Sequence, residues 1–133
     1  MGTRSRIGKT NKDGSVTSIY VHWDGYLDHV GRILANHYTT DEKVDGLVGL
    51  GDLSSLGEEI GTKHNFDTCP RNECNAYGRD RGEDGVEPVT HDMSEWPDSG
   101  WEYRYLWDSG AWLVSKGDDG FTDLREALER KGG

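Results

Sequence analysis

The feature that most constrains this chain is its shortage of branched aliphatic side chains at a net charge of −10. Leu, Ile, Val and Phe make up fewer than one in five of its 133 residues, a composition typical of disordered chains. Five Trp and six Tyr residues offset the shortage, because each buries roughly 150–250 Å². We therefore predict a single domain over residues 1–133 whose core depends on aromatic packing.

A β-hairpin is the first element that the sequence predicts. Residues 3–10 and 15–23 read as strands and flank Asn11-Lys12-Asp13-Gly14, in which Asp-Gly is a turn signal. Because side chains alternate across a strand, one set in the second strand is expected to enter the core. That set is Ile19, Val21 and Trp23, opposite Ser18, Tyr20 and His22.

Helical patterns follow the hairpin. A helix is expected from residue 27 to residue 38, and Gly31 inside it indicates a close crossing of helix and sheet. Thr39, with Glu42 three residues later, is typical of a capping box that opens a second helix. A short helical turn is expected within residues 50–60. The apolar stripes are Leu27, Val30, Leu34 and Tyr38, then Val44, Leu47 and Val48, then Leu50, Leu53, Leu56 and Ile60.

The carboxyl-terminal part predicts a second hairpin and a last helix. Alternating aromatics favour a strand over 101–107, a turn at Asp108-Ser109-Gly110, a partner strand over 111–116 and a helix over 121–131. This order indicates an α+β fold. We expect a largely antiparallel sheet built from the N- and C-terminal hairpins, with two to three helices packed on one face. Weaker patterns predict strands near 75–79 and 86–90 and a turn at 96–100.

The first candidate site is the pentapeptide between the first hairpin and the first helix. A histidine near a carboxylate can take part in acid–base chemistry, and two large rings can stack on a base or a sugar. The structural alternative is that the rings belong to the core, the carboxylate caps the helix and the histidine is solvated. The residues concerned are His22, Trp23, Asp24 and Tyr26.

The second candidate site lies between Tyr77 and Asp84. Arg79 and Arg81 could hold an anion, because the guanidinium fork suits phosphate or carboxylate and the flanking glycines permit close backbone approach. Ion pairs with the neighbouring acidic residues are an equally physical explanation. The ligand-binding hypothesis uses Tyr77, Arg79 and Arg81.

A third pattern raises the alternative of a metal site. His64, Cys69, Cys74 and His91 supply two imidazoles and two thiolates, which zinc accepts. The gap between the cysteines is at the edge of the usual spacing, and His91 lies far downstream. We therefore predict no metal and no cofactor, with two free cysteines as the simpler explanation.

Four segments occur together in a specific combination. They resemble a family of small proteins encoded by tailed bacteriophages and prophages, over about residues 1–84. The resemblance carries no established activity, catalytic residue or cofactor, and Cys69 and Cys74 stand outside it. It implies an accessory protein made in an infected bacterial cell and directed at host machinery or defence. The segments are MGTRS at 1–5, YVHWDGY at 20–26, LGDLSSLG at 50–57 and YGRDRGE at 77–83.

The charge and the absence of motifs narrow the choice of function. An acidic surface repels phosphate backbones, so direct binding of duplex DNA is not expected, whereas a basic protein partner is. No apolar run reaches the length of a membrane span. A nucleophile elbow, a Walker loop and a dinucleotide fingerprint are also absent. We expect a protein of the bacterial cytoplasm, and the missing motifs weaken the case for an enzyme without ending it.

Three hypotheses therefore stand at this level. The first is an accessory protein that binds and modulates a basic host protein, by mimicry of a nucleic acid in one version. The second is a protein that sequesters a nucleotide or another small phosphorylated ligand between Trp23, Tyr26, Arg79 and Arg81. The third is a metal-dependent hydrolase that uses His22 and Asp24. Whether the pentapeptide and the arginine segment share one cleft would discriminate the second from the first.

Overall fold

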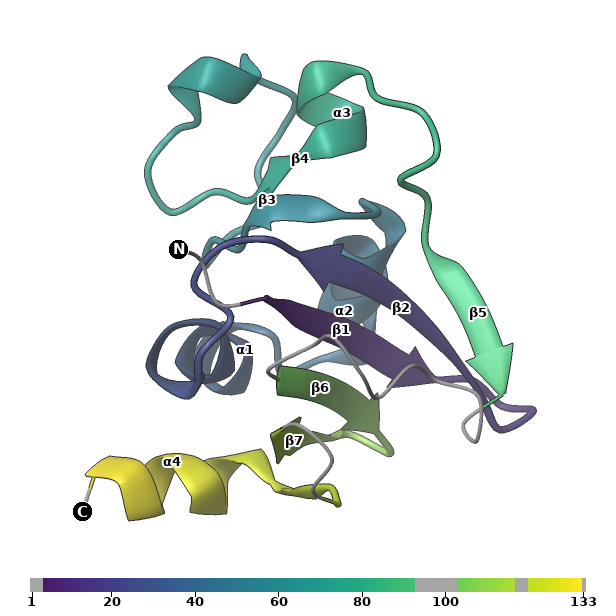
Figure 1. The fold of residues 1–133 in the computed structure, drawn as a ribbon, viewed down its shortest axis with the longest axis vertical. Helices are drawn as coiled ribbons and strands as arrows, with labels where there is room; N and C mark the ends of the chain where they lie inside the picture. The colour runs from purple at the N-terminus through teal and green to yellow at the C-terminus, as the bar shows by residue number, and fades with distance from the viewer. Residues whose placement is uncertain (1–3, 93–102, 117–119, 133) are drawn as a thin grey trace.

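A computed structural model describes residues 4–92, 103–116 and 120–132, which form an α+β fold around one mixed sheet (Figure 1). The strands are β1 Ser5–Thr10, β2 Ser15–Val21, β3 Leu53–Ser55, β4 Asn75–Ala76, β5 Val89–Asp92, β6 Tyr103–Asp108, β7 Ala111–Lys116 and β8 Thr122–Asp123. The helical elements are the π-helical turn η1 Leu27–Gly31, α1 Arg32–His37, α2 Asp41–Gly49, the 3₁₀ turn η2 Phe66–Thr68, α3 Tyr77–Arg81 and α4 Leu124–Gly132.

The sheet joins the two predicted hairpins side by side. Its order is β4-β3-β2-β1-β6-β7-β8, and β5 also pairs with β2. The β1–β2 and β6–β7 hairpins are antiparallel, as are the β2–β5, β3–β4 and β7–β8 pairs. The β1–β6 and β2–β3 pairs are parallel. The largely antiparallel sheet that the sequence predicts is confirmed.

Two strands share one edge of β2. β3 pairs with its end at Val21, and β5 pairs with its beginning from Ser15 to Ser18. Between them the Asp52 carboxylate accepts a hydrogen bond from the Tyr20 backbone N–H at 2.9 Å. Burial raises the pKa of Asp52. Asp52 thus satisfies a backbone donor that neither neighbouring strand reaches.

The helices η1–α1, α2 and α4 pack on one face of the sheet, as predicted. Their buried side chains meet Ile7, Ile19 and Tyr105 in a single cluster. Gly31 lies where α1 approaches α4 and β6, and a Cβ added there would sit 3.3 Å from side-chain atoms of Leu124 and Tyr105. The close crossing expected at this glycine is confirmed.

Buried aromatic rings join sheet and helices, and each uses its polar atom. Tyr38 donates to the Gly57 carbonyl at 2.8 Å, and Tyr105 donates to the Gly25 carbonyl at 2.7 Å. The Trp112 indole donates to the Tyr38 carbonyl at 2.7 Å. These rings share the cluster with many Val, Leu and Ile side chains, so the core is mixed rather than dominantly aromatic.

Three local predictions are wrong. Thr40, not Thr39, caps α2 by accepting from the Lys43 N–H at 3.2 Å, and position 43 carries no carboxylate to complete a capping box. The segment expected to form a helical turn within residues 50–60 forms β3 instead, because pairing with β2 overrides its helical spacing. The strand expected over 75–79 is limited to β4 and turns into α3.

The carboxyl-terminal hairpin and last helix are present, but α4 begins at Leu124 because Thr122 and Asp123 pair with β7 as β8. β6 and β7 form the hairpin, and the Asp123 carboxylate accepts from the Glu126 N–H at 3.1 Å at the start of α4. Trp101 and the turn expected at 96–100 lie outside the described residues. In the part of the chain that is described, no helix combines the length and apolar character needed to cross a membrane.

Candidate functional site

Trp23 is exposed at the junction that follows β2. Its side chain is 44% exposed, so the prediction that it enters the core with Ile19 and Val21 is wrong. The strand ends at Val21 and Asp24 adopts a left-handed φ of 56°, so the alternation of β2 does not continue to Trp23. The sequence pattern extended the strand two residues too far.

The junction is held by backbone hydrogen bonds. The His22 and Trp23 N–H groups donate to the carbonyls of Leu53 and Ser54, each at 3.0 Å. The Asp24 carbonyl accepts from the Val30 N–H at 3.4 Å, whereas η1 has no side-chain cap. Asp24 therefore does not cap the helix with its carboxylate. A 40% exposed Tyr26 precedes η1.

His22 is linked to a phenol. Its Nδ1 lies 2.6 Å from the Tyr20 hydroxyl, and its ring meets the Trp23 ring edge-on with centroids 4.6 Å apart. The partner of this ring nitrogen is therefore Tyr20 rather than the Asp24 carboxylate expected for acid–base chemistry. Tyr20 and His22, the residue after β2 ends, thus lie on the same side of the chain, as the alternation predicts.

Asp52 connects this cluster to α3. Its carboxylate accepts from the Tyr20 N–H, and its carbonyl accepts from the Tyr77 N–H at 3.2 Å. Burial raises the pKa of the Tyr20 hydroxyl, Arg4 opposes the rise, and Tyr77 and Asp52 add to it. The backbone N–H groups of Tyr20 and Tyr77 therefore both donate to Asp52, and the two predicted segments meet at this residue.

The contacts continue from Tyr77 along α3. Phe66 stacks on Tyr77 with ring centroids 5.5 Å apart. The Arg81 guanidinium lies 5.1 Å from the centroid of Phe66 and 5.9 Å from that of Tyr77, and it also pairs with Glu83 at 3.4 Å. We call the whole series the aromatic row. It comprises two groups of contacting side chains that Asp52 links through backbone hydrogen bonds: Trp23, His22 and Tyr20, and Tyr77, Phe66 and Arg81.

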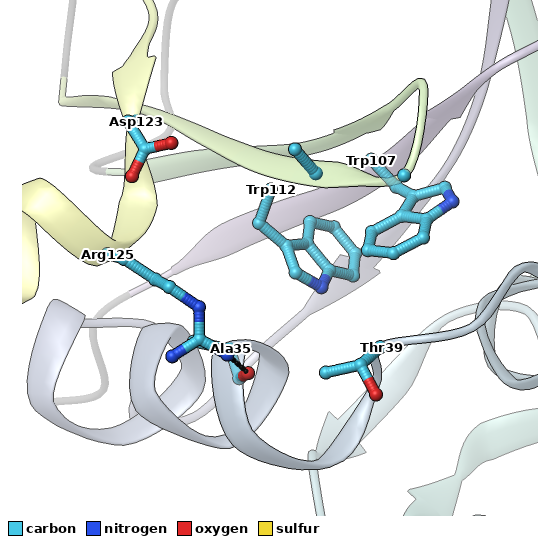
Figure 2. Close-up of a pocket in the computed structure, with 8 residues that line it drawn as sticks. Ala35, Thr39, Trp107, Trp112, Asp123 and Arg125 are labelled. Carbon is cyan, nitrogen blue, oxygen red and sulfur yellow. Dashed lines mark hydrogen bonds between the residues drawn. The ribbon is translucent and has the colours of Figure 1, made fainter.

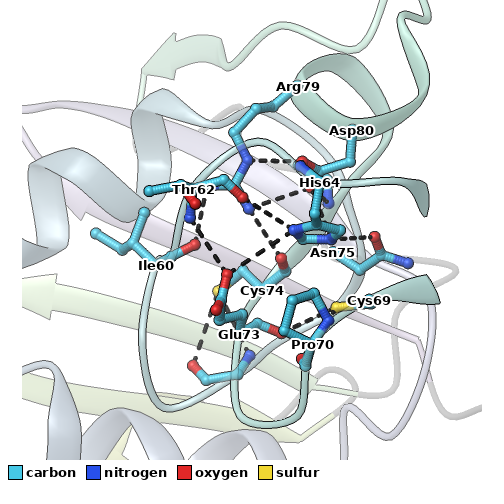
Figure 3. Close-up of polar contacts among 12 residues, drawn as sticks. Ile60, Thr62, His64, Cys69, Pro70, Glu73, Cys74, Asn75, Arg79 and Asp80 are labelled. Atoms are coloured by element: carbon cyan, nitrogen blue, oxygen red, sulfur yellow. Dashed lines mark hydrogen bonds and ion pairs between the residues drawn. The ribbon is translucent and has the colours of Figure 1, made fainter.

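Arg79 points inward instead of joining the row (Figure 3). Its guanidinium donates to both Asp80 oxygens at 2.9 and 3.1 Å and to the carbonyls of Ile60 and Cys74 at 2.8 and 2.9 Å. The Asp80 side chain is fully buried. Arg79 therefore organises internal structure, and the anion site expected from two neighbouring arginines is not assembled.

The four residues of the alternative zinc site are likewise not assembled. Cys74 is buried against the Tyr38 hydroxyl at 3.4 Å, and burial raises the pKa of its thiol. His64 contacts Asn75, whereas His91 lies on β5 in register with Val16. Across residues 4–92, 103–116 and 120–132, no group of three or more His, Cys, Asp or Glu side chains is placed to hold a metal ion.

Three described cavities lie away from the aromatic row. The one in Figure 2 has a volume of about 190 Å³ and lies between Trp107, Trp112 and the end of α1. Arg125 reaches across it and donates to the Ala35 carbonyl at 2.7 Å, so that it caps α1. The other two, of about 440 and 350 Å³, lie beside the β1–β2 turn and between β7 and α4. None of the three is lined by a residue of the row.

Comparison of the chain with protein-family models, curated proteins and solved structures finds no match. The sequence predicts four members of the row, His22, Trp23, Tyr77 and Arg81. It misses Phe66, which carries no periodic signal, and Tyr20, whose place beside His22 on one strand face was its only signal.

Proposed function

We propose that this protein is a non-catalytic accessory protein that binds a basic bacterial protein through the aromatic row. The infected bacterial cytoplasm is the setting that the bacteriophage resemblance implies. The observation that carries the proposal is the 44% exposure of Trp23, whose ring packs edge-on against the His22 ring. An exposed Trp fixed by strand and loop hydrogen bonds is a ready anchor for a partner protein.

The composition of the row supports a protein partner. Trp, Tyr and Arg are the residues that dominate the energetics of protein interfaces, and the row contains all three. Tyr26, 40% exposed, follows Trp23 by three residues and packs against His29. Since Trp23 and Tyr20 lie on or next to paired strands, little backbone ordering is required on binding.

The charge of the chain supports a basic partner. A net charge of −10 attracts positively charged proteins and repels phosphate. Long-range attraction of this kind raises the association rate and weakens with salt, because the Debye length shortens from about 10 Å at 0.1 M to about 3 Å at 1 M. The affinity supplied by Trp23 is expected to persist at higher salt.

Affinity capture from bacterial lysate with matched variants tests the proposal. Wild-type protein and Trp23→Ala are compared, with Val89→Ala as the control because Val89 is 43% exposed on a different strand. We expect wild type and Val89→Ala to capture the same basic partner. Trp23→Ala should capture at least tenfold less of it, and added salt should reduce the amount captured by wild type. A partner retained equally by Trp23→Ala would exclude this surface.

The nucleotide-binding alternative has its own test. The structure gives it less support, because Arg79 is committed to internal acceptors. Thermal denaturation is measured with a panel of nucleotides, since a ligand at about 100 times its Kd adds about 2.7 kcal/mol to the stability of the folded state. If a nucleotide stabilises the wild-type protein and Arg81→Ala abolishes that stabilisation, the function of the row is to bind a small ligand rather than a protein.

A further inference from the structure

A polar cluster centred on His64 holds the loop that carries Phe66 (Figure 3). The loop leaves the body of the protein after Ile60 and returns at Glu73, where Glu73 pairs with Glu59 across an isolated bridge. Phe66 reaches out of this loop to stack on Tyr77. The contacts of His64 therefore help to fix the position of Phe66, at one end of the aromatic row.

Both ring nitrogens of His64 face hydrogen-bond acceptors. Nδ1 lies 2.9 Å from the Thr62 carbonyl, and Nε2 lies 3.0 Å from Oδ1 of Asn75. The orientation of the Asn75 amide is set by its other end, because Nδ2 donates to the Phe66 carbonyl at 3.1 Å. A neutral imidazole has only one N–H, so satisfying both acceptors requires the imidazolium form.

The charges around His64 independently favour the imidazolium form. Nε2 is 3.5 Å from Asp80 and Nδ1 is 3.8 Å from Glu73, while the His64 side chain is only 10% exposed. Arg79 supplies one positive charge against these two carboxylates. The imidazolium balances the cluster, and a neutral ring would leave one carboxylate uncompensated in a poorly solvated place.

The remaining titratable neighbours do not supply that balance. Burial raises the pKa of the Cys69 thiol, and the carboxylates of Asp80 and Glu73 raise it further. Burial also raises the pKa of the Cys74 thiol. Both cysteines are therefore neutral near pH 7, and the charges that face His64 are those of Glu73, Asp80 and Arg79.

We propose that protonated His64 is a latch that docks the loop from Gly61 to Thr68, and that loss of its proton releases the loop and withdraws Phe66 from Tyr77. Release would uncover the Tyr77 end of the aromatic row, so the partner-binding surface differs between acidic and alkaline conditions. This biological meaning rests on the proposed function. The latch itself is a property of the isolated protein and can be tested without a partner.

Two measurements on the isolated protein test the latch. Nitrogen NMR of the imidazole at pH 6 is expected to show both His64 ring nitrogens protonated. Hydrogen exchange then follows the amide of His64, which donates to Asp80 at 3.1 Å, and those of Asp67 and Thr68. Their protection factors, corrected for intrinsic rates, are expected to fall by up to about tenfold per pH unit once His64 deprotonates, the limit for one coupled proton.

Matched variants separate the latch from general loosening. In His64→Gln the loop is expected to show low protection at every pH, while amides of β1 and β2 keep theirs and report that the protein is folded. Glu73→Gln keeps the Oε1 acceptor that receives the Thr62 N–H at 3.2 Å but removes a charge. It is expected to move loop release to lower pH. His37→Gln is the control, since His37 faces Glu58 at 3.6 Å elsewhere.

The outcomes distinguish the latch from the proposed function. A singly protonated His64 ring at pH 6, or loop protection that stays pH-dependent in His64→Gln, would overturn the latch. If the latch is found but Trp23→Ala captures the same partner as wild type, the proposed function fails and the latch stands. If Trp23 is needed for capture but the loop is insensitive to pH, the latch fails and the proposed function stands.

Discussion

At the scale of single residues, the Arg79–Asp80 pair has a structural role that its sequence context does not predict. Adjacent residues in an exposed, charged segment would ordinarily form weak surface pairs. Here Asp80 is fully enclosed and also accepts from the Ala76 N–H at 2.8 Å and the His64 N–H at 3.1 Å. A carboxylate with these partners organises the backbone around β4 and α3.

Replacement of Asp80 by Asn is expected to lower the free energy of unfolding by about 3 kcal/mol. The reason is that removing one partner of a buried pair leaves the other charge uncompensated. Urea denaturation at pH 7 measures the change. Asp84→Asn, an exposed carboxylate in the same segment, is the control and should change stability by less than about 0.5 kcal/mol.

The same residue predicts a pH dependence. Burial acts to raise the pKa of Asp80, but hydrogen bonds from Arg79, Ala76 and His64 outweigh it, and the net shift is downward. The contribution of Asp80 to stability is therefore complete above the ordinary pKa of an Asp side chain, about 3.9. This contribution is lost as the pH falls through the lower pKa of Asp80 in the folded protein. The stability difference between wild type and Asp80→Asn should shrink steadily below about pH 4. A constant difference would contradict the assignment.

At the scale of elements, the segment after β3 crosses the returning loop at very short range. A Cβ added to Gly57 would lie 2.3 Å from the Glu73 carbonyl carbon and 2.5 Å from the Asn72 oxygen. Both are backbone atoms, which cannot move aside as a side-chain tip does. The close approach lets the Tyr38 hydroxyl and Cys74 reach Gly57 as well.

Gly57→Ala is therefore expected to destabilise the protein by about 2 kcal/mol, as overpacking does. Gly49→Ala supplies the opposite case, because nothing lies within 4 Å of its added Cβ in α2. That change should stabilise the protein by about 0.5 kcal/mol through helix propensity. Thermal denaturation of the two variants gives the signs, and equal effects would show that the crossing is not as tight as described.

At the scale of the whole molecule, two buried tyrosines connect segments that are far apart in sequence. Tyr38 joins the end of α1 to the segment after β3, and Tyr105 joins β6 to the junction before η1. Burial raises the pKa of both hydroxyls. In the unfolded chain both hydroxyls would ionise near the ordinary tyrosine pKa of about 10.

Stability is thus expected to decline as pH rises above about 10, because only the unfolded state then releases these protons. Urea denaturation at several alkaline pH values measures the slope. Tyr105→Phe should lower stability at pH 8 by about 1 kcal/mol, for the lost hydrogen bond, and should also make the alkaline slope shallower by one proton. An unchanged slope would mean that Tyr105 ionises in the folded state.

The local elements were largely predictable, because each depends on patterns within about ten residues. The stripe of Leu27, Val30, Leu34 and Tyr38 specifies a helix face, and all four side chains are buried. The turn at Asn11 to Gly14 is confirmed by the Gly14 N–H, which donates to the Asn11 carbonyl at 3.0 Å. Periodicity encodes these elements wherever they dock.

Only the tertiary structure decided which polar and aromatic groups meet. The exposure of Trp23 depends on where β2 stops pairing, and the burial of Arg79 depends on carbonyls from Ile60 and Cys74. Such contacts arise from parallel pairings and loop crossings between distant segments, for which a single sequence carries no periodic signal. The chain by itself determined its two hairpins, the helices η1–α1, α2 and α4, and the apolar faces of these helices. The aromatic row and the His64 cluster were determined by how those pieces close against one another, because burial and hydrogen-bond partners are properties of the packed whole.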